Sequence, residues 1–260
     1  MSRTLPALRE ALGRHRPLTC AHRGGMARAP ENTLSAFQRA LAAGVDMVEL
    51  DVQLTSDGEV VVMHDPDLRR TTDGSGTVRE ASLEEVRRLD AGSWFGAQFR
   101  GERVPTLAEV LDWARGRVYL QIELKPYGAR ADVLCERVVQ LIRERKMQDQ
   151  VMLLSFDHHV LRWCKQMAPD IITGAICQAR LIDPVGVVRM AAADALCVDF
   201  EHLRPEEVEA LHRAQIAVHS FAPTSDALRD LASWGVDIVQ SDDPEALGAL
   251  AVGRARTHGA

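Results

Sequence analysis

The feature that most constrains this chain is a regular alternation of short apolar runs with longer helical patterns. Such an alternation favours a parallel sheet whose strands are joined by helices. The apolar runs are Leu18–Ala21, Met47–Leu54, Val60–Met63, Val118–Leu124, Val151–Leu154, Ile171–Ile176, Ala195–Val198, Ile216–Phe221 and Val236–Val239. The helical patterns are Leu34–Ala43, Leu107–Ala114, Ala131–Lys146, His158–Met167, Val185–Ala192, Pro205–Ala214, Ser225–Trp234 and Pro244–Leu250.

A chain of 260 residues has the length of one (β/α)8 barrel, about 250 residues, but the runs supply one strand too many. Thr55-Ser56-Asp57-Gly58 contains an Asp-Gly pair, which is typical of a β-hairpin turn. Strands joined by a hairpin are antiparallel. We therefore expect Val60–Met63 to fold back beside Met47–Leu54, and the rest of residues 1–260 to form a single α/β domain, a (β/α)8 TIM barrel.

Residues 66–104 interrupt the alternation. They are far longer than an ordinary βα loop of about 2–6 residues. The segment contains one short helical pattern, Leu83–Leu89, and the aromatic residues Trp94, Phe95 and Phe99. We predict a small structured insertion on the loop side of the barrel, with the aromatics as its core. It either shapes access to the site or only stabilises the fold.

Charge and composition exclude several classes of partner. The net charge is −6 and no long basic run occurs, so nucleic acid and anionic membranes find no matching surface. The sequence lacks a secretory apolar segment and any stretch of the ~18 apolar residues that read as a membrane span. We expect a soluble cytoplasmic protein without stable membrane association, and leave its oligomeric state open. The five cysteines are an odd number without a C-x-x-C pair, which predicts reduced, buried thiols.

Carboxylates occur where barrel strands are expected to end, the region that carries catalysis in this fold. Glu49 and Asp51 are two apart on one strand and share a face. Glu123 ends another strand. Burying such carboxylates together is costly unless a cation lies between them. An all-oxygen site suits Mg²⁺ or Ca²⁺ better than zinc. The alternatives are solvated carboxylates on an edge strand and a plain ion pair of Glu123 with Lys125.

Two histidines fall at the same rim. His22 ends the first strand, before Gly24-Gly25, and His64 ends the extra strand. Because an imidazole titrates near neutral pH, the pair suits general acid–base cleavage of a phosphodiester, and we take His22 as the base. Arg23 and Lys125 could bind the phosphate. The alternative for His22 is a core histidine beside a flexible turn.

Two further positions have open roles. Pro30-Glu31-Asn32-Thr33 precedes a predicted helix, so Asn32 or Thr33 is expected to cap that helix, while Glu31 could instead reach the site. His219 lies within a predicted barrel strand and could point inward.

Taken together, these motifs make the chain similar to the glycerophosphodiester phosphodiesterases of the cytoplasmic bacterial type, from about residue 17 to about residue 250. The matching segments are Ala21-His22-Arg23-Gly24, Ala29-Pro30-Glu31-Asn32-Thr33, Glu49-Leu50-Asp51-Val52, Val62-Met63-His64-Asp65, Arg70-Thr71-Thr72-Asp73-Gly74, Leu89-Asp90-Ala91-Gly92-Ser93-Trp94-Phe95, Val104-Pro105-Thr106-Leu107, Glu123-Leu124-Lys125, Gly235-Val236-Asp237 and Ser241-Asp242-Asp243-Pro244.

The resemblance implies a (β/α)8 barrel that hydrolyses glycerophosphodiesters to sn-glycerol 3-phosphate and an alcohol. It implies that Glu49, Asp51 and Glu123 bind a divalent cation. It further implies that His22 and His64 are the acid–base pair, and that Arg23 and Lys125 hold the phosphate. In such enzymes the 2-hydroxyl of the glycerol can attack phosphorus to give a cyclic phosphate that water then opens.

One segment departs from the family pattern. The penultimate barrel strand of such proteins usually carries Trp-Thr-Val-Asn, where this chain has His219-Ser220-Phe221-Ala222. The difference leaves the preferred head group open. His219 could suit a different head group or a longer lipid chain. A lysophospholipase D or another phosphodiesterase with the same residues is the first alternative. A different metal-dependent barrel, such as an aldolase or isomerase, and a non-catalytic scaffold are weaker ones.

Overall fold

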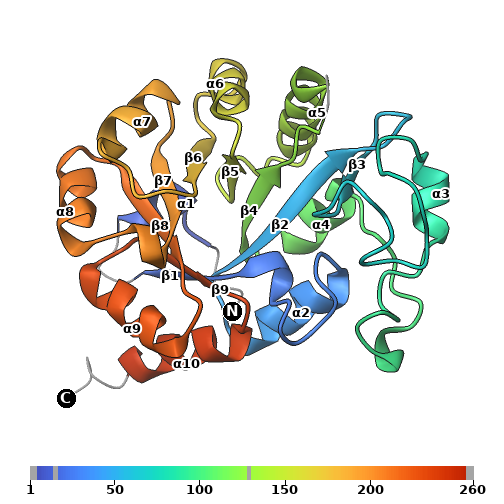
Figure 1. Cartoon of the computed structure of the whole chain (residues 1–260), viewed down its shortest axis with the longest axis horizontal. Coiled ribbons are helices and arrows are strands. Elements are labelled where there is room, and N and C mark those ends of the chain that lie inside the picture. The colour runs from blue at the N-terminus through green and yellow to red at the C-terminus, as the bar shows by residue number, and fades with distance from the viewer. Residues whose placement is uncertain (1–4, 14–16, 128–129, 256–260) are drawn as a thin grey trace.

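The computed structural model describes residues 5–13, 17–127 and 130–255, with side chains up to residue 250. Eight parallel strands form a closed barrel surrounded by helices (Figure 1). Their order is β1-β9-β8-β7-β6-β5-β4-β2, and a pairing of β1 with β2 closes the ring. The predicted (β/α)8 barrel is therefore confirmed.

The strands are β1 (Leu18–Ala21), β2 (Met47–Leu54), β3 (Val60–Val62), β4 (Tyr119–Leu124), β5 (Val151–Ser155), β6 (Ile172–Cys177), β7 (Ala195–Asp199), β8 (Ala217–Phe221) and β9 (Ile238–Ser241). The helices are α1 (Leu8–Leu12), α2 (Leu34–Ala43), α3 (Leu83–Arg88), α4 (Leu107–Ala114), α5 (Ala131–Glu144), α6 (His158–Met167), α7 (Pro184–Met190), α8 (Pro205–Arg213), α9 (Ser225–Trp234) and α10 (Pro244–Ala255). Within the described residues, none of these helices is long and apolar enough to cross a membrane.

The extra strand β3 lies beside β2 and outside the ring. β3 is antiparallel to the last three residues of β2, with Leu54 opposite Val60. The first residues of β2 pair instead with β1, Met47 opposite Cys20. The turn between β2 and β3 contains Gly58 at φ 83°, a conformation that glycine adopts without steric cost. The predicted hairpin is confirmed, and it carries the chain back to the level of Asp51, whose carbonyl oxygen accepts the N–H of Met63.

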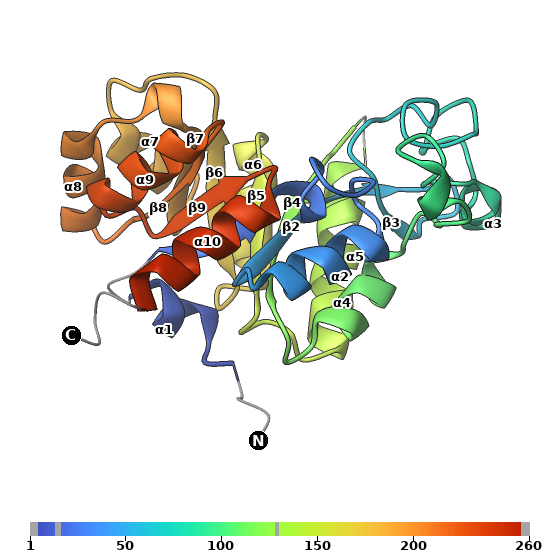
Figure 2. The same ribbon diagram turned by 90° about the horizontal axis from the view of Figure 1, so that it is seen from below.

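Two apolar layers leave only one end of the barrel for chemistry. Outward side chains such as Val48 and Leu50 pack beneath the helices. Inward side chains such as Met47 and Met152 fill the lower barrel together with Leu8 of α1. In Figure 2, α1 lies at the lower end of the barrel and the segment around α3 extends from its upper right. The acidic side chains of β2 and β4 lie toward the carboxyl ends of the strands, while Gln121 is buried within the barrel and accepts a hydrogen bond from Cys20 Sγ.

The insertion has its own small core, but not the predicted one. Aliphatic residues such as Val61, Val78 and Val86 are buried together there. Trp94, Phe95 and Phe99 contact one another edge to face, yet Trp94 is 40% exposed and the other two are only partly buried. The prediction of an aromatic core was wrong because aliphatic side chains from β3 and α3 already fill the space beneath this segment.

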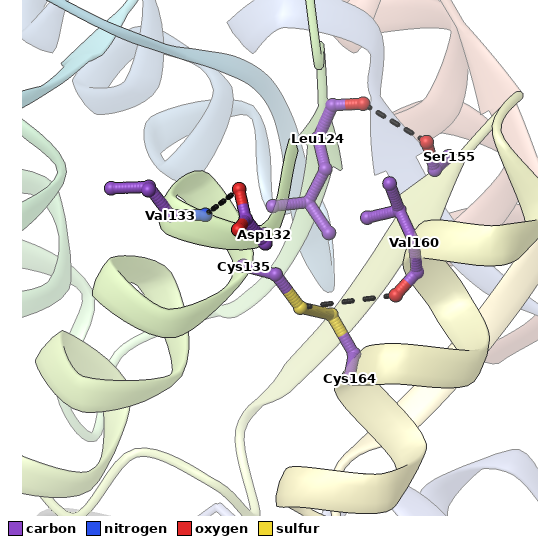
Figure 3. The surroundings of a disulfide bond; sticks show 7 residues. All are labelled: Leu124, Asp132, Val133, Cys135, Ser155, Val160 and Cys164. Atoms are coloured by element: carbon purple, nitrogen blue, oxygen red, sulfur yellow. Dashed lines mark hydrogen bonds between the residues drawn. A yellow bond between two sulfur atoms is a disulfide. The ribbon is translucent and has the colours of Figure 1, made fainter. Parts of the chain in front are cut away.

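A disulfide joins Cys135 of α5 to Cys164 of α6 (Figure 3). The prediction of five reduced thiols was therefore wrong for this pair, while Cys20, Cys177 and Cys197 are free. The two Cα atoms are 6.1 Å apart, within the range that a disulfide spans. The sequence gives no spacing signal, because α5 and α6 become neighbours only when the barrel assembles.

Candidate active site

Three carboxylates converge at the mouth of the barrel. β2 and β4 are parallel neighbours, and their register places Asp51 opposite Glu123. One oxygen from each of Glu49, Asp51 and Glu123 lies within 4.8 Å of the others, and all three residues are buried. The strand that carries Glu49 and Asp51 belongs to the closed barrel, so the alternative of solvated carboxylates on an edge strand is wrong.

The positive charge of Lys125 only partly compensates this cluster. Lys125 Nζ lies 2.6 Å from Glu123 Oε1 and 3.3 Å from Asp51 Oδ1. Burial, followed by repulsion from Asp51, still raises the pKa of Glu49 to about 7 and that of Glu123 to about 8. Burial also opposes ionisation of Asp51, but the charges of Lys125 and Arg23 outweigh it and lower the pKa of that carboxyl. An additional cation would stabilise all three ionised groups.

The loop after β1 orients two of these carboxylates, one through a backbone N–H and the other through a side-chain amide. Arg23 adopts φ 49° and its N–H donates to Glu49 Oε2 at 2.8 Å. Asn32, at φ 59°, donates from Nδ2 to Asp51 Oδ2 at 2.8 Å and accepts the N–H of Asp51 at 3.2 Å. Thr33, and not Asn32, caps α2 by accepting the N–H of Ala36. Asn32 therefore fixes Asp51, a role that the capping interpretation missed.

His22 is held in place by a carboxylate from the other end of the chain. Its Nδ1 lies 2.6 Å from Asp242 Oδ1, and its Nε2 lies 3.9 Å from Glu49 Oε2. Burial acts to lower the pKa of His22, but the contacts with Asp242 and Glu49 outweigh it, and the pKa is raised. The sequence analysis did not single out Asp242, although its position after the last strand was a usable signal.

His64 is held by a chain of ion pairs that reaches back to the first loop. Its Nδ1 lies 2.6 Å from Asp65 Oδ1, and Asp65 also binds Arg70. Arg70 forms two hydrogen bonds to Glu31, each of 2.8 Å, and Arg23 binds Glu31 at 2.9 Å. Burial is the main reason that the pKa of His64 is lowered. Glu31 thus reaches the site as an ionic bridge, one of the two roles considered for it.

All seven residues predicted for the site therefore lie at one mouth of the barrel. Six of them line a cavity of about 280 Å³: His22, Arg23, Glu49, His64, Glu123 and Lys125. The seventh, Asp51, lies within the carboxylate cluster. The far wall is formed by residues from β5 to β9 and the loops that follow, including Phe156, Asp199, His219, Phe221 and Gln240. Of these the sequence analysis noted only His219 and the segment around it.

Comparison with known proteins agrees with this arrangement. The chain matches the model of the Glycerophosphoryl diester phosphodiesterase family over residues 22–246, and it belongs to this family. It is 39% identical over 234 residues to a glycerophosphodiester phosphodiesterase of Caldanaerobacter subterraneus subsp. tengcongensis, covering 88% of this chain and 96% of that protein. A glycerophosphodiester phosphodiesterase of Bacillus subtilis is 31% identical over 248 residues, 88% of this chain and 85% of that protein.

Solved structures give the same result. A phosphodiesterase of Oleispira antarctica, determined in complex with the product sn-glycerol-3-phosphate, superimposes with a TM-score of 0.86 at 30% identity. The match covers 91% of this chain and 97% of that chain. The resemblance to the glycerophosphodiester phosphodiesterases, inferred from short motifs, is confirmed.

Proposed function

We propose that this protein hydrolyses glycerophosphodiesters to sn-glycerol 3-phosphate and an alcohol, using two histidines and a divalent cation. The observation that carries the proposal is the cluster of Glu49, Asp51 and Glu123 in one cavity wall with His22 and His64. The Oleispira relative, which binds sn-glycerol-3-phosphate, supports the choice of product.

The donor set fits a hard cation, Mg²⁺ or Ca²⁺. The ligands are carboxylate oxygens only, which those ions prefer. Asp51 Oδ1 and Glu123 Oε1 are buried without a hydrogen bond of normal geometry among the described residues, although Lys125 lies near both. The two raised carboxyl pKa values indicate that the cluster lacks positive charge. A bound cation would offset the negative charge on the phosphoryl oxygens.

The protein's own cations complete the phosphate site. Arg23 and Lys125 both line the cavity. Because Arg23 is also held by Glu31, its guanidinium is positioned before substrate arrives. Lys125 is held between Asp51 and Glu123. These two side chains would orient the phosphodiester so that its scissile bond lies between the imidazoles.

The two imidazoles differ in a way that favours one division of labour. The raised pKa of His22 favours its protonated form, which a general acid needs. The lowered pKa of His64 favours its neutral form, which a general base needs. We therefore propose His64 as the base and His22 as the acid, the reverse of the working assignment made from the sequence. Asp242 and Asp65 fix the orientation of the two rings.

One observation favours a second candidate, lysophospholipase D activity. Phe156 lines the cavity and is 47% exposed, so an apolar chain could pack on it. The aromatics of the insertion do not line this cavity.

A cytoplasmic location remains part of our proposal, although the disulfide between Cys135 and Cys164 counts against it, because disulfides are rare in the cytosol.

The test is a coupled assay for released glycerol 3-phosphate. Glycerophosphocholine, glycerophosphoethanolamine, glycerophosphoglycerol and a lysophospholipid are offered with chelator, and then with Mg²⁺ or Ca²⁺ restored. We expect turnover of the glycerophosphodiesters that chelation abolishes and one of the two cations restores. Turnover in the presence of chelator would refute the role of the cation. A lysophospholipase D would leave lysophosphatidic acid and release the free head group, so the lysophospholipid is followed by a head-group assay, and turnover of the lysophospholipid alone would favour the second candidate.

A further inference from the structure

The cavity wall opposite the carboxylates contains a buried imidazole, that of His219, which lacks a hydrogen bond of normal geometry to the described residues. His219 of β8 lines the cavity and is only 4% exposed. Neither Nδ1 nor Nε2 has a hydrogen-bond partner of normal geometry among the described residues. Buried polar groups in folded proteins are almost always paired. An unpaired side chain that faces a cavity is therefore suited to bind a ligand there.

His219 is also uncharged, which limits the chemical classes of ligand that it can bind. Burial and the nearby charge of His22 lower its pKa to about 3, and weak hydrogen bonding to the nearby side chain of Gln240 opposes this to a smaller extent. A neutral imidazole offers one N–H donor and one nitrogen acceptor. Gln240, on the neighbouring strand β9, also lines the cavity and offers an amide donor and an oxygen acceptor. These groups match a hydroxyl, which both donates and accepts.

Other parts of a phosphodiester fit the ring of His219 less well. A phosphate oxygen only accepts hydrogen bonds and is drawn to Arg23 and Lys125, which lie on the other wall. An ammonium group would gain charge compensation from Asp199, elsewhere on this wall, and not from the neutral ring of His219. The side chain of Phe221 points into the same cavity two residues further along β8 and provides an apolar surface for the carbons that bear the hydroxyl.

We propose that His219 binds a hydroxyl group of the substrate and so selects phosphodiesters that carry a polyol. This inference rests on the proposed function and adds the part of the substrate that the far wall recognises. The hydroxyl has two sources, the glycerol that stays on the phosphate and the alcohol that leaves. His219 is a specificity residue and takes no part in proton transfer.

The experiment compares H219L with H219Q, because leucine removes both polar atoms and glutamine restores a donor and an acceptor. The substrates are glycerophosphoglycerol, which carries hydroxyls on both sides of the phosphorus, and p-nitrophenyl glycerophosphate, which carries them only on the retained glycerol. Phenyl phosphate, which has no hydroxyl, serves as a competitive inhibitor and reports on the phosphate site alone. V218A is the control, because Val218 precedes His219 on β8 and is also buried, but does not line the cavity.

We expect H219L to lower kcat/KM for glycerophosphoglycerol by about 10- to 100-fold, the scale of a hydrogen bond lost from a buried site. The inhibition constant of phenyl phosphate should stay within about twofold of the wild-type value, because the phosphate site is intact. This constant does not depend on the fraction of folded enzyme. H219Q should recover part of the loss, and V218A should keep the wild-type ratio of activity to inhibition. A matching loss with p-nitrophenyl glycerophosphate assigns the hydroxyl to the glycerol, and a loss confined to glycerophosphoglycerol assigns it to the leaving alcohol.

Two results would overturn the inference. In one, H219L cleaves both substrates as wild type does. In the other, phenyl phosphate inhibition weakens as much as activity falls, which indicates a merely structural role. If the wild-type protein does not cleave glycerophosphodiesters at all, the proposed function fails instead, so the two failures are distinguishable.

Discussion

The two walls of the cavity are built on opposite plans. On the wall formed by β1, β2, β4 and the β2–β3 hairpin, the charged residues are tied to one another: Asp242 holds His22, Asp65 holds His64, and Glu31 joins Arg23 to Arg70. On the wall formed by β7 to β9, His219 is buried and has no hydrogen bond of normal geometry to any of the described residues. The difference indicates that the first wall is preorganised, as the proposed phosphate site requires. The second wall keeps a polar side chain available for another group of the substrate.

The largest effect should come from the first wall. His22→Ala and His64→Ala should each lower kcat by roughly 10²–10⁴, the usual contribution of a general acid or base. The measurement is release of glycerol 3-phosphate at saturating substrate and cation. Glu84→Gln is the matched control, because Glu84 is an exposed carboxylate on α3 that pairs only with Arg88 among the described residues. A histidine variant that keeps nearly full turnover would remove that residue from the mechanism. It would also contradict the view that the first wall carries the catalytic groups.

A smaller effect should separate the two histidines. Asp242→Asn should lower kcat/KM by about 10- to 100-fold, as when an outer carboxylate that orients a ligand histidine is lost. Because Asp242 raises the pKa of His22, the substitution lowers it. If His22 is the acid, the alkaline limb of the pH–rate profile moves to lower pH. Movement of the acidic limb would instead identify His22 as the base, and an unchanged profile would show that the ring is not titrating in catalysis.

The smallest effect should be seen in stability and not in rate. Burial and Asp51 raise the pKa of Glu49 from 4.5 to about 7 and that of Glu123 from 4.5 to about 8. Between the ordinary pKa and the raised pKa of each carboxyl, the folded protein holds more protons than the unfolded chain, so the free energy of unfolding falls as pH rises. In chelator, Tm should fall between pH 5 and pH 8, and a bound cation should cancel this contribution. The gap in Tm between cation and chelator should therefore widen with pH, and a constant gap would argue against ion binding by these carboxylates.

Much of the fold followed from the sequence, because period and turn chemistry are local. Alternation placed all nine strands, and Asp57-Gly58 alone was enough to assign β3 to a hairpin. The convergence of Glu49, Asp51 and Glu123 followed from the rule that parallel strands end at one edge. These inferences needed only the residues of one segment at a time.

What escaped prediction depends on contacts between distant segments. Asp242 meets His22 across 220 positions, and Asn32 meets Asp51 across 19, so neither role has a local pattern. The pairing of Cys135 with Cys164 depends likewise on which helices become neighbours. The direction of each imidazole pKa depends on burial and on partners from other strands, and the working assignment of base and acid had no such information.

The position of β3 has a consequence for the residue that we propose as the base. The ring closes through β1 and β2 without β3, yet β3 leads directly to His64 and then to Asp65 and Arg70. The residue that we propose as the base is thus reached from a strand outside the ring, although Val60 and Val62 of that strand pack in the main core. A change confined to the segment after β3 could therefore remove the proposed base and leave the three carboxylates on ring strands.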